Sequence, residues 1–418
     1  MMSPNPDTPF FSMFIAWIHT RSVVLLNGSR LIRFFGVGLL IALSPSWARA
    51  SLVDECDRLA AYLDDPHYKG VGVTFDQNLL LEALDACKRA LEQEPENPRI
   101  IYQYGRALLA DGKNTEGEAW IRKSAERLYP HALFTVGILE QGSTPPNMAK
   151  AAENYRKAAE LKHPDSMVML GYLLQNGLGL SPDAVEALVW YRRAAEMGNA
   201  NGQTEVGIAY WAGFGVLQNS AEAARWFALA ADRDSQAGYY LGIMYMTGDG
   251  VEKDSVKAYR LFRSAAGHGN QGASGALGAC YLFGRGVEVN YDEGIRLLRK
   301  AAEQNDMDSM RWLGSVLVQP GRSNEDIKDG IDLLTRAAEM GDQAAANGLA
   351  SIYFYGHGVP MDKHKAAYWM SEAERLRKRE EGLRPRKMPA PWPELPLGGA
   401  PQILPCFSDD RFNIECVV

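Results

Sequence analysis

The sequence predicts an all-α fold, a right-handed α-solenoid of stacked helix–turn–helix units. Two sequence markers support this prediction, because they recur along the chain with nearly the same repeat length. An Ala-Ala pair returns every 35 or 36 residues, and a Gly that follows an apolar residue returns every 34 to 36 residues. The pairs begin at Ala158, Ala194, Ala230, Ala265, Ala301 and Ala337. The glycines are Gly137, Gly171, Gly207, Gly242, Gly278 and Gly314, with Ala350 in the next register.

The first 50 residues are expected to form a targeting segment. Two arginines precede an apolar run at 34–43, and the stretch ends in Ala-Arg-Ala at 48–50. This order is typical of a secretory signal peptide, and about 10 apolar residues are fewer than the roughly 20 that a membrane span needs. We therefore expect export to the periplasm or the extracellular space, with cleavage after Ala50. The alternative is an uncleaved anchor that holds the protein on the inner membrane, facing the periplasm.

The charge of the exported part argues against nucleic-acid partners. Residues 1–50 hold four Arg and one Asp, so the 44 basic and 51 acidic residues of the chain become 40 and 50. The mature net charge is then −10. Nucleic-acid affinity depends on Lys and Arg that neutralise phosphates, so we expect no nucleic-acid partner.

The five cysteines fit an oxidising compartment. Cys56 and Cys87 lie in the first mature segment, Cys406 and Cys416 lie in the tail, and Cys280 is left over. Two local disulfides are the simplest pairing, although four cysteines allow three connectivities. No C-x-x-C pair or Cys/His cluster indicates a metal or redox centre, so we expect no metal and no cofactor.

Within each period the apolar spacing is that of two helices. Small residues such as Gly242 and Ala266 let the two helices approach, and Phe262 fills the space beyond. A Gly-x-Gly lies between the helices in five units, first at Gly177 and last at Gly356. A phosphate-binding loop of this kind would follow a strand, and no strand pattern is present. We interpret the motif as a joint in which Gly ends one helix and a polar residue caps the next.

The repeated pattern resembles the Sel-1-like repeat, a branch of the tetratricopeptide superfamily. Most of the signature is carried by the unit from Asn201, "NGQTEVGIAYWAGFGVLQNSAEAARWFALAADRD". The resemblance covers about seven units between 131 and 378. A plain tetratricopeptide-like unit precedes them at 80–130, after a capping region at 51–79. Residues 379–418 turn basic and then Pro-rich, which predicts an irregular tail.

The resemblance implies a non-catalytic scaffold that binds a protein or peptide in the concave groove of the solenoid. The first helix of each unit would line this groove with residues six and three before, and one and four after, the repeated Gly. The candidate binding residues are Phe134, Tyr172, Ile208, Trp211, Tyr239, Ile243, Met246, Leu282, Arg311 and Phe354. Packing against neighbouring units or beneath the tail is the alternative role for these side chains. Arg311 is the candidate partner for a carboxylate of the bound protein.

The sequence does not predict an enzyme. No G-x-S-x-G or S-x-x-K motif occurs, and the seven His are scattered. The resemblance supplies one alternative, because some secreted, cysteine-rich Sel-1-like proteins have been associated with β-lactam binding or hydrolysis. The alternative function is therefore a hydrolase or binder of β-lactam or peptidoglycan-type ligands. Those relatives carry a disulfide in nearly every repeat, whereas the Sel-1-like units here hold one cysteine.

Overall fold

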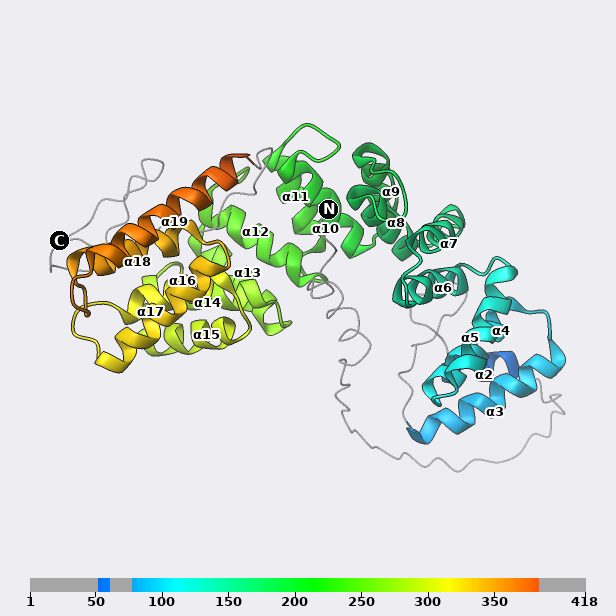
Figure 1. The fold of residues 1–418 in the computed structure, drawn as a ribbon. Helices are drawn as coiled ribbons and strands as arrows, with labels where there is room; N and C mark the ends of the chain where they lie inside the picture. The colour runs from blue at the N-terminus through cyan, green and yellow to red at the C-terminus, as the bar shows by residue number, and fades with distance from the viewer. Residues whose placement is uncertain (1–51, 61–76, 383–418) are drawn as a thin grey trace, which may run out of the picture. The chain divides into compact units, whose positions relative to one another are not determined.

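The structure is a computed structural model that describes residues 52–60 and 77–382, where the chain forms helices and no strand (Figure 1). This confirms the predicted all-α fold. The targeting segment 1–50 and the tail from 383 onward lie outside the described residues. The helices are α2 (Leu52–Ala60), α3 (Gln77–Gln93), α4 (Pro98–Ala110), α5 (Asn114–Glu126), α6 (Pro130–Gly142), α7 (Met148–Glu160), α8 (Pro164–Asn176), α9 (Ala184–Glu196), α10 (Ala200–Ala212), α11 (Ser220–Ala230), α12 (Ser235–Thr247), α13 (Ser255–Gly267), α14 (Gln271–Phe283), α15 (Tyr291–Glu303), α16 (Met307–Leu317), α17 (Asn324–Glu339), α18 (Gln343–Tyr355) and α19 (Lys363–Gly382).

Consecutive helices pack in pairs, as the solenoid prediction requires. From α4 onward each even-numbered helix packs on the odd-numbered helix that follows it, and each pair packs on the next. We call the even-numbered member of a pair the A-helix and the odd-numbered member the B-helix. Among the described helices, none is long and apolar enough to cross a membrane.

The Gly-x-Gly motifs are joints between the two helices of a pair. The first Gly ends the A-helix in the left-handed conformation, as Gly248 does with φ of 80°. The second Gly also has positive φ, and a Cβ on Gly250 would lie 2.3 Å from the carbonyl carbon of Ser220, at the start of the preceding B-helix. Asp254 then caps the next helix by accepting from the backbone NH of Lys257 at 2.9 Å. The motif therefore connects the two helices of one pair and also packs against the B-helix of the preceding pair.

The repeated Gly of the A-helix is required by close packing within the pair. A Cβ at Gly242 would lie 2.5 Å from the ring of Phe262, which is fully buried on the B-helix α13. Three earlier pairs show the same contact at 2.4–2.6 Å, between Gly137 and Tyr155, Gly171 and Tyr191, and Gly207 and Phe227. The ring occupies the space that a methyl group would need.

The first described helices are joined covalently. Cys56 of α2 and Cys87 of α3 form a disulfide, inside a small apolar cluster that also holds Ile100 of α4. Cys280 is a free, buried thiol whose pKa burial raises to about 12. Cys406 and Cys416 lie outside the described residues, so their predicted disulfide stays a prediction.

Candidate partner-binding surface

One stripe of the A-helices α8, α10 and α12 stays partly open to solvent. It contains the residues six and two before, and one and five after, the repeated Gly, which share a face because they are spaced by three or four. We call this set the A-helix stripe. In α8, α10 and α12 all its members except Ile243 keep some exposure. These members are Asp165, Met169, Tyr172, Asn176, Asn201, Glu205, Ile208, Ala212, Gln236, Tyr240, Ile243 and Thr247.

This stripe differs from the predicted surface. The positions three before and four after the Gly face the next pair instead of an open groove. Phe134 packs on His163 with ring centroids 5.0 Å apart. The indole NH of Trp211 donates to Asp249 at 2.6 Å, and its ring lies 5.5 Å from that of Tyr240. These contacts bury the side chains between units.

The ten candidate residues therefore fall into three groups. The structure buries Phe134, Trp211, Ile243, Met246, Leu282 and Arg311. It leaves Tyr172, Ile208 and Tyr239 half-buried, and Phe354 is 50% exposed. The expectation that the first six present an open face is corrected, because neighbouring pairs cover them. A binding role for the other four stays a prediction.

Arg311 is satisfied within the protein. Its Nε donates to Asp342 at 2.8 Å and its Nη2 to Asp308 at 2.5 Å, and the side chain is buried. Asp342 also caps α18 by accepting from the NH of Ala345. The guanidinium thus links α16 to α18. The prediction that it pairs with a carboxylate of a partner is corrected, because both of its carboxylate partners belong to this chain.

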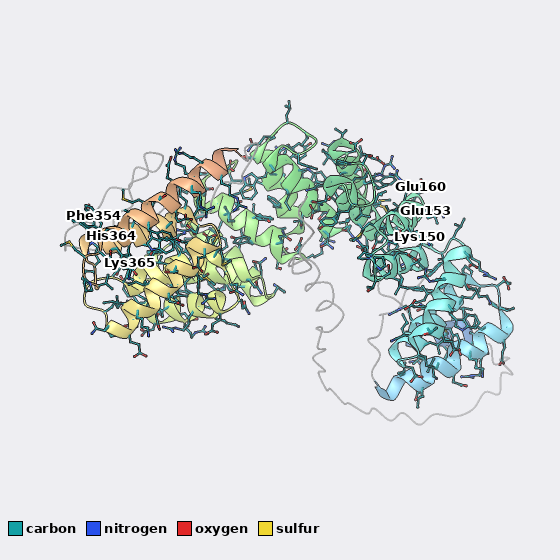
Figure 2. All side chains as sticks on the ribbon, in the orientation of Figure 1. Lys150, Glu153, Glu160, Phe354, His364 and Lys365 are labelled. Atoms are coloured by element: carbon teal, nitrogen blue, oxygen red, sulfur yellow. A yellow bond between two sulfur atoms is a disulfide. The ribbon has the colours of Figure 1, made fainter. Side chains whose placement is uncertain are left out.

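The A-helices and B-helices differ in charge. Across the seven A-helices between residues 130 and 355, Arg311 is the one Lys or Arg, and it is internally paired. In α8 and α10 the stripe instead carries the carboxylates Asp165 and Glu205. Lys and Arg lie on the B-helices together with acidic residues, as Lys150, Glu153 and Glu160 do on α7 (Figure 2). The A-helices α8, α10 and α12 therefore carry no positive charge of their own, and the cations near them come from the B-helices.

Glu205 is the chemically distinctive residue of the stripe. Its side chain is half-buried, and its carboxyl has no hydrogen-bond partner within the described part of the chain. Desolvation, and second the nearby charge of Asp234, raises the pKa of Glu205 to about 7. The Glu205 charge in turn helps raise the pKa of Tyr191 and Tyr240, for which burial is the main cause. A desolvated carboxyl without a partner is a candidate acceptor for a bound ligand.

The structure also shows a buried histidine pair that the sequence did not suggest. The rings of His131 and His163 meet edge-on with centroids 4.6 Å apart, and both residues are buried. His163 caps α8 by accepting from the NH of Ser166 at 3.2 Å. Burial, with a smaller effect of His131, lowers the pKa of His163 to about 3. Their 32-residue separation, close to one repeat, was the available signal.

Two further observations concern metal ions and small molecules. No group of three His, Cys, Asp or Glu side chains that could hold a metal ion occurs in the parts of the chain that the structure describes. A shallow hollow of about 180 Å³ lies between α15 and α17, and Arg299, Glu303, Asp329 and Arg336 contribute to its walls. Typical ligand pockets measure roughly 300–1,000 Å³, so this hollow is small for an organic substrate.

Comparisons with known proteins agree with the repeat architecture. The family model of the Sel1 repeat matches residues 130–163, 164–199, 200–235, 235–270, 274–306, 308–342 and 343–376. No curated protein matches this chain.

Two solved structures are similar over long stretches. The chain is 27% identical to c5321, a protective antigen present in uropathogenic Escherichia coli strains displaying an SLR fold, with a TM-score of 0.56 over 70% of this chain. The match spans 64% of c5321, which is slightly less than two thirds of its length. A Sel1 repeat protein from Oxalobacter formigenes is 26% identical, with a TM-score of 0.52, over 58% of this chain and 96% of that one.

Proposed function

Because the chain belongs to the Sel1 repeat family, we propose that it is a non-catalytic scaffold that binds a protein or peptide along its A-helix stripe. Proteins of this repeat type are typically interaction scaffolds. The observation that carries the proposal is the stripe across α8, α10 and α12. It offers half-buried tyrosines and carboxylates, and no Lys or Arg lies on these three helices.

The chemistry of the stripe favours a partner segment that carries Lys or Arg. A cation beside Glu205 would lower the raised pKa of this carboxyl and form a charge-assisted hydrogen bond with it. The half-buried rings of Tyr172 and Tyr240 lie on the same stripe, and Tyr240 already packs on Trp211 and Phe227, so a cation or aromatic side chain of the partner would extend an existing aromatic cluster. Asp165 is already bonded to the side-chain NH of Asn199 at 2.8 Å, so it is oriented before a partner arrives.

We place the scaffold outside the cytoplasm, in the periplasm or the extracellular space. Two features support this placement. The sequence pattern of residues 30–50 is that of a signal peptide cleaved after Ala50, and the Cys56–Cys87 disulfide fits an oxidising compartment. An uncleaved N-terminal anchor is the alternative. In such a compartment the partner would belong to an envelope complex or to a sensor domain.

The proposal is tested by affinity capture from the native envelope fraction. Asn201 is exposed on the stripe, one helical turn from Glu205, so Asn201→Lys adds a competing cation without disturbing the core. The matched control is Glu160→Lys, an exposed position on the B-helix α7 (Figure 2). We expect a stoichiometric protein partner that Asn201→Lys loses and Glu160→Lys retains. Equal capture by both variants would contradict the stripe as the binding surface. Turnover of a β-lactam or peptidoglycan fragment, abolished by one substitution, would favour the hydrolase.

A further inference from the structure

The last helix pair, α18 and α19, has an exposed face, whereas in earlier pairs the next pair covers the equivalent face. Phe354 stands four residues after the Gly position of α18 and is 50% exposed. In the four preceding A-helices the residue at this position is 1–5% exposed, because the next pair covers it. Those residues are Trp211, Met246, Leu282 and Val318.

The B-helix of the same pair repeats the observation. Met370 of α19 is 60% exposed. Its counterparts in the six earlier B-helices are at most 1% exposed, namely Tyr155, Tyr191, Phe227, Phe262, Leu298 and Leu334. The next pair contributes to this burial, as when Phe227 packs on Tyr240 with centroids 5.4 Å apart.

The uncovered face is apolar and aromatic. Tyr355 is 59% exposed and packs edge-on against Phe354 with ring centroids 4.9 Å apart. Phe354 lies at the end of α18, and His364 and Lys365, also labelled in Figure 2, lie at the start of α19. Terminal units of a solenoid normally end the stack with a polar outer face, and an exposed apolar patch marks a contact site. We call Phe354 and Met370, whose counterparts in earlier pairs are buried, the open end.

We propose that the chain's own C-terminal segment, residues 383–418, covers the open end, with its Pro-rich stretch 388–397 lying on Phe354 and Met370. Length permits this contact. The 12 residues from Met370 to Gly382 span about 18 Å of helix. The 10 residues from Gly382 to Trp392 span up to about 31 Å in an extended polyproline conformation, which is enough to fold back to Met370.

The composition of the segment fits the surface. The stretch reads "MPAPWPELPL", and its four prolines favour the extended conformation that docks on aromatic side chains. Trp392 and Leu395 supply the apolar groups that would replace the missing next unit. Because the segment is tethered, its effective concentration is of millimolar order, which favours it over a second copy of the chain.

The test is site-specific photo-crosslinking in the full exported chain at nanomolar concentration. The photoreactive residue is p-benzoylphenylalanine at position 354, where an exposed aromatic already stands. The matched control places it at Leu217, which is 86% exposed in an earlier joint. We expect position 354 to give crosslinks within one chain to residues 388–397, and position 217 to give none to that segment. Trp392→Ala with Leu395→Ala should lower the yield at least fivefold.

Three results would overturn the proposal. Covalent dimers from position 354 would identify a second copy as the occupant. Crosslinks to another protein would identify a partner, and equal tail crosslinking from both positions would show that the contact is not specific. The proposed function concerns α8, α10 and α12, so each of these results leaves the Asn201→Lys capture experiment intact.

Discussion

Replacing Glu205 by Gln should change the pH dependence of folding in a defined direction. Desolvation raises the pKa of this carboxyl to about 7 from an ordinary value of 4.5. The folded protein therefore keeps the Glu205 proton up to about pH 7, whereas the unfolded chain loses it near 4.5. Between these values the folded state binds the additional proton, so its stability falls as the pH rises.

The magnitude follows from the same two values. Each pH unit between them corresponds to 1.36 kcal/mol, which gives an upper limit of about 3 kcal/mol above pH 7. Glu205 is half-buried and solvent screens part of this cost, so we expect about 1–3 kcal/mol in measurement. Gln has nearly the same shape and no proton to lose, so Glu205→Gln should match the wild type at pH 4.5 and exceed its stability at pH 8.

The assay is urea unfolding of both proteins at pH 4.5, 6, 7 and 8, with hydrogen exchange on α10 as a local readout. The exchange readout matters because long repeat arrays can unfold in parts. Glu196→Gln is the matched control, since Glu196 is an exposed residue of the neighbouring B-helix α9. A stability difference for Glu205→Gln that is constant from pH 4.5 to 8 would refute the reasoning.

Three further substitutions test the packing. Gly242→Ala should lower the unfolding free energy by about 1–3 kcal/mol in urea unfolding, because the added methyl group meets the Phe262 ring. Arg311→Met should cost about 3–5 kcal/mol in the same assay, because it leaves Asp342 buried without its cation. His163→Asn should reduce the loss of stability as the pH falls from about 6.5 to 3, because the folded pKa of His163 is lowered to about 3 and Asn also caps helices.

Each of these experiments has a control and a contrary outcome. A Cβ at Gly267 meets nothing within 4 Å, so Gly267→Ala should not destabilise. Arg296→Met removes an exposed ion pair with Glu293 and should leave the urea midpoint unchanged. If Gly242→Ala or Arg311→Met is as harmless as its control, the packing described here is incorrect. For His163→Asn the contrary result is an acid unfolding profile that coincides with that of the wild type.

The sequence predicted the joints and the close helix contacts correctly because both depend on local chemistry. A Gly such as Gly248 can end a helix by adopting the left-handed conformation, whatever packs around it. A Gly on the apolar face of a helix indicates that a second helix approaches closely at that position. The contact of Gly242 with Phe262 follows from that rule, and the structure shows it with a distance of 2.5 Å.

The surface was harder to predict because it depends on how one pair stacks on the next. Periodicity identifies Trp211 and Met246 as apolar residues on one face of a helix. It does not tell whether that face meets solvent or the neighbouring pair, and the structure buries both residues. Two of the four stripe positions lie one residue further along the helix than predicted. In α10 the stripe therefore holds Glu205, two residues before Gly207, where the prediction had the residue three before it. The His131–His163 contact was missed for the same reason, since it joins adjacent units.

The central claim is that a partner binds along the A-helix stripe, and hydrogen exchange with the captured partner bound tests it most directly. We predict slower exchange in α8, α10 and α12 of the complex, with α9, α11 and α13 unchanged. Protection confined to the B-helices, or no protection in any of these six helices, would contradict the account.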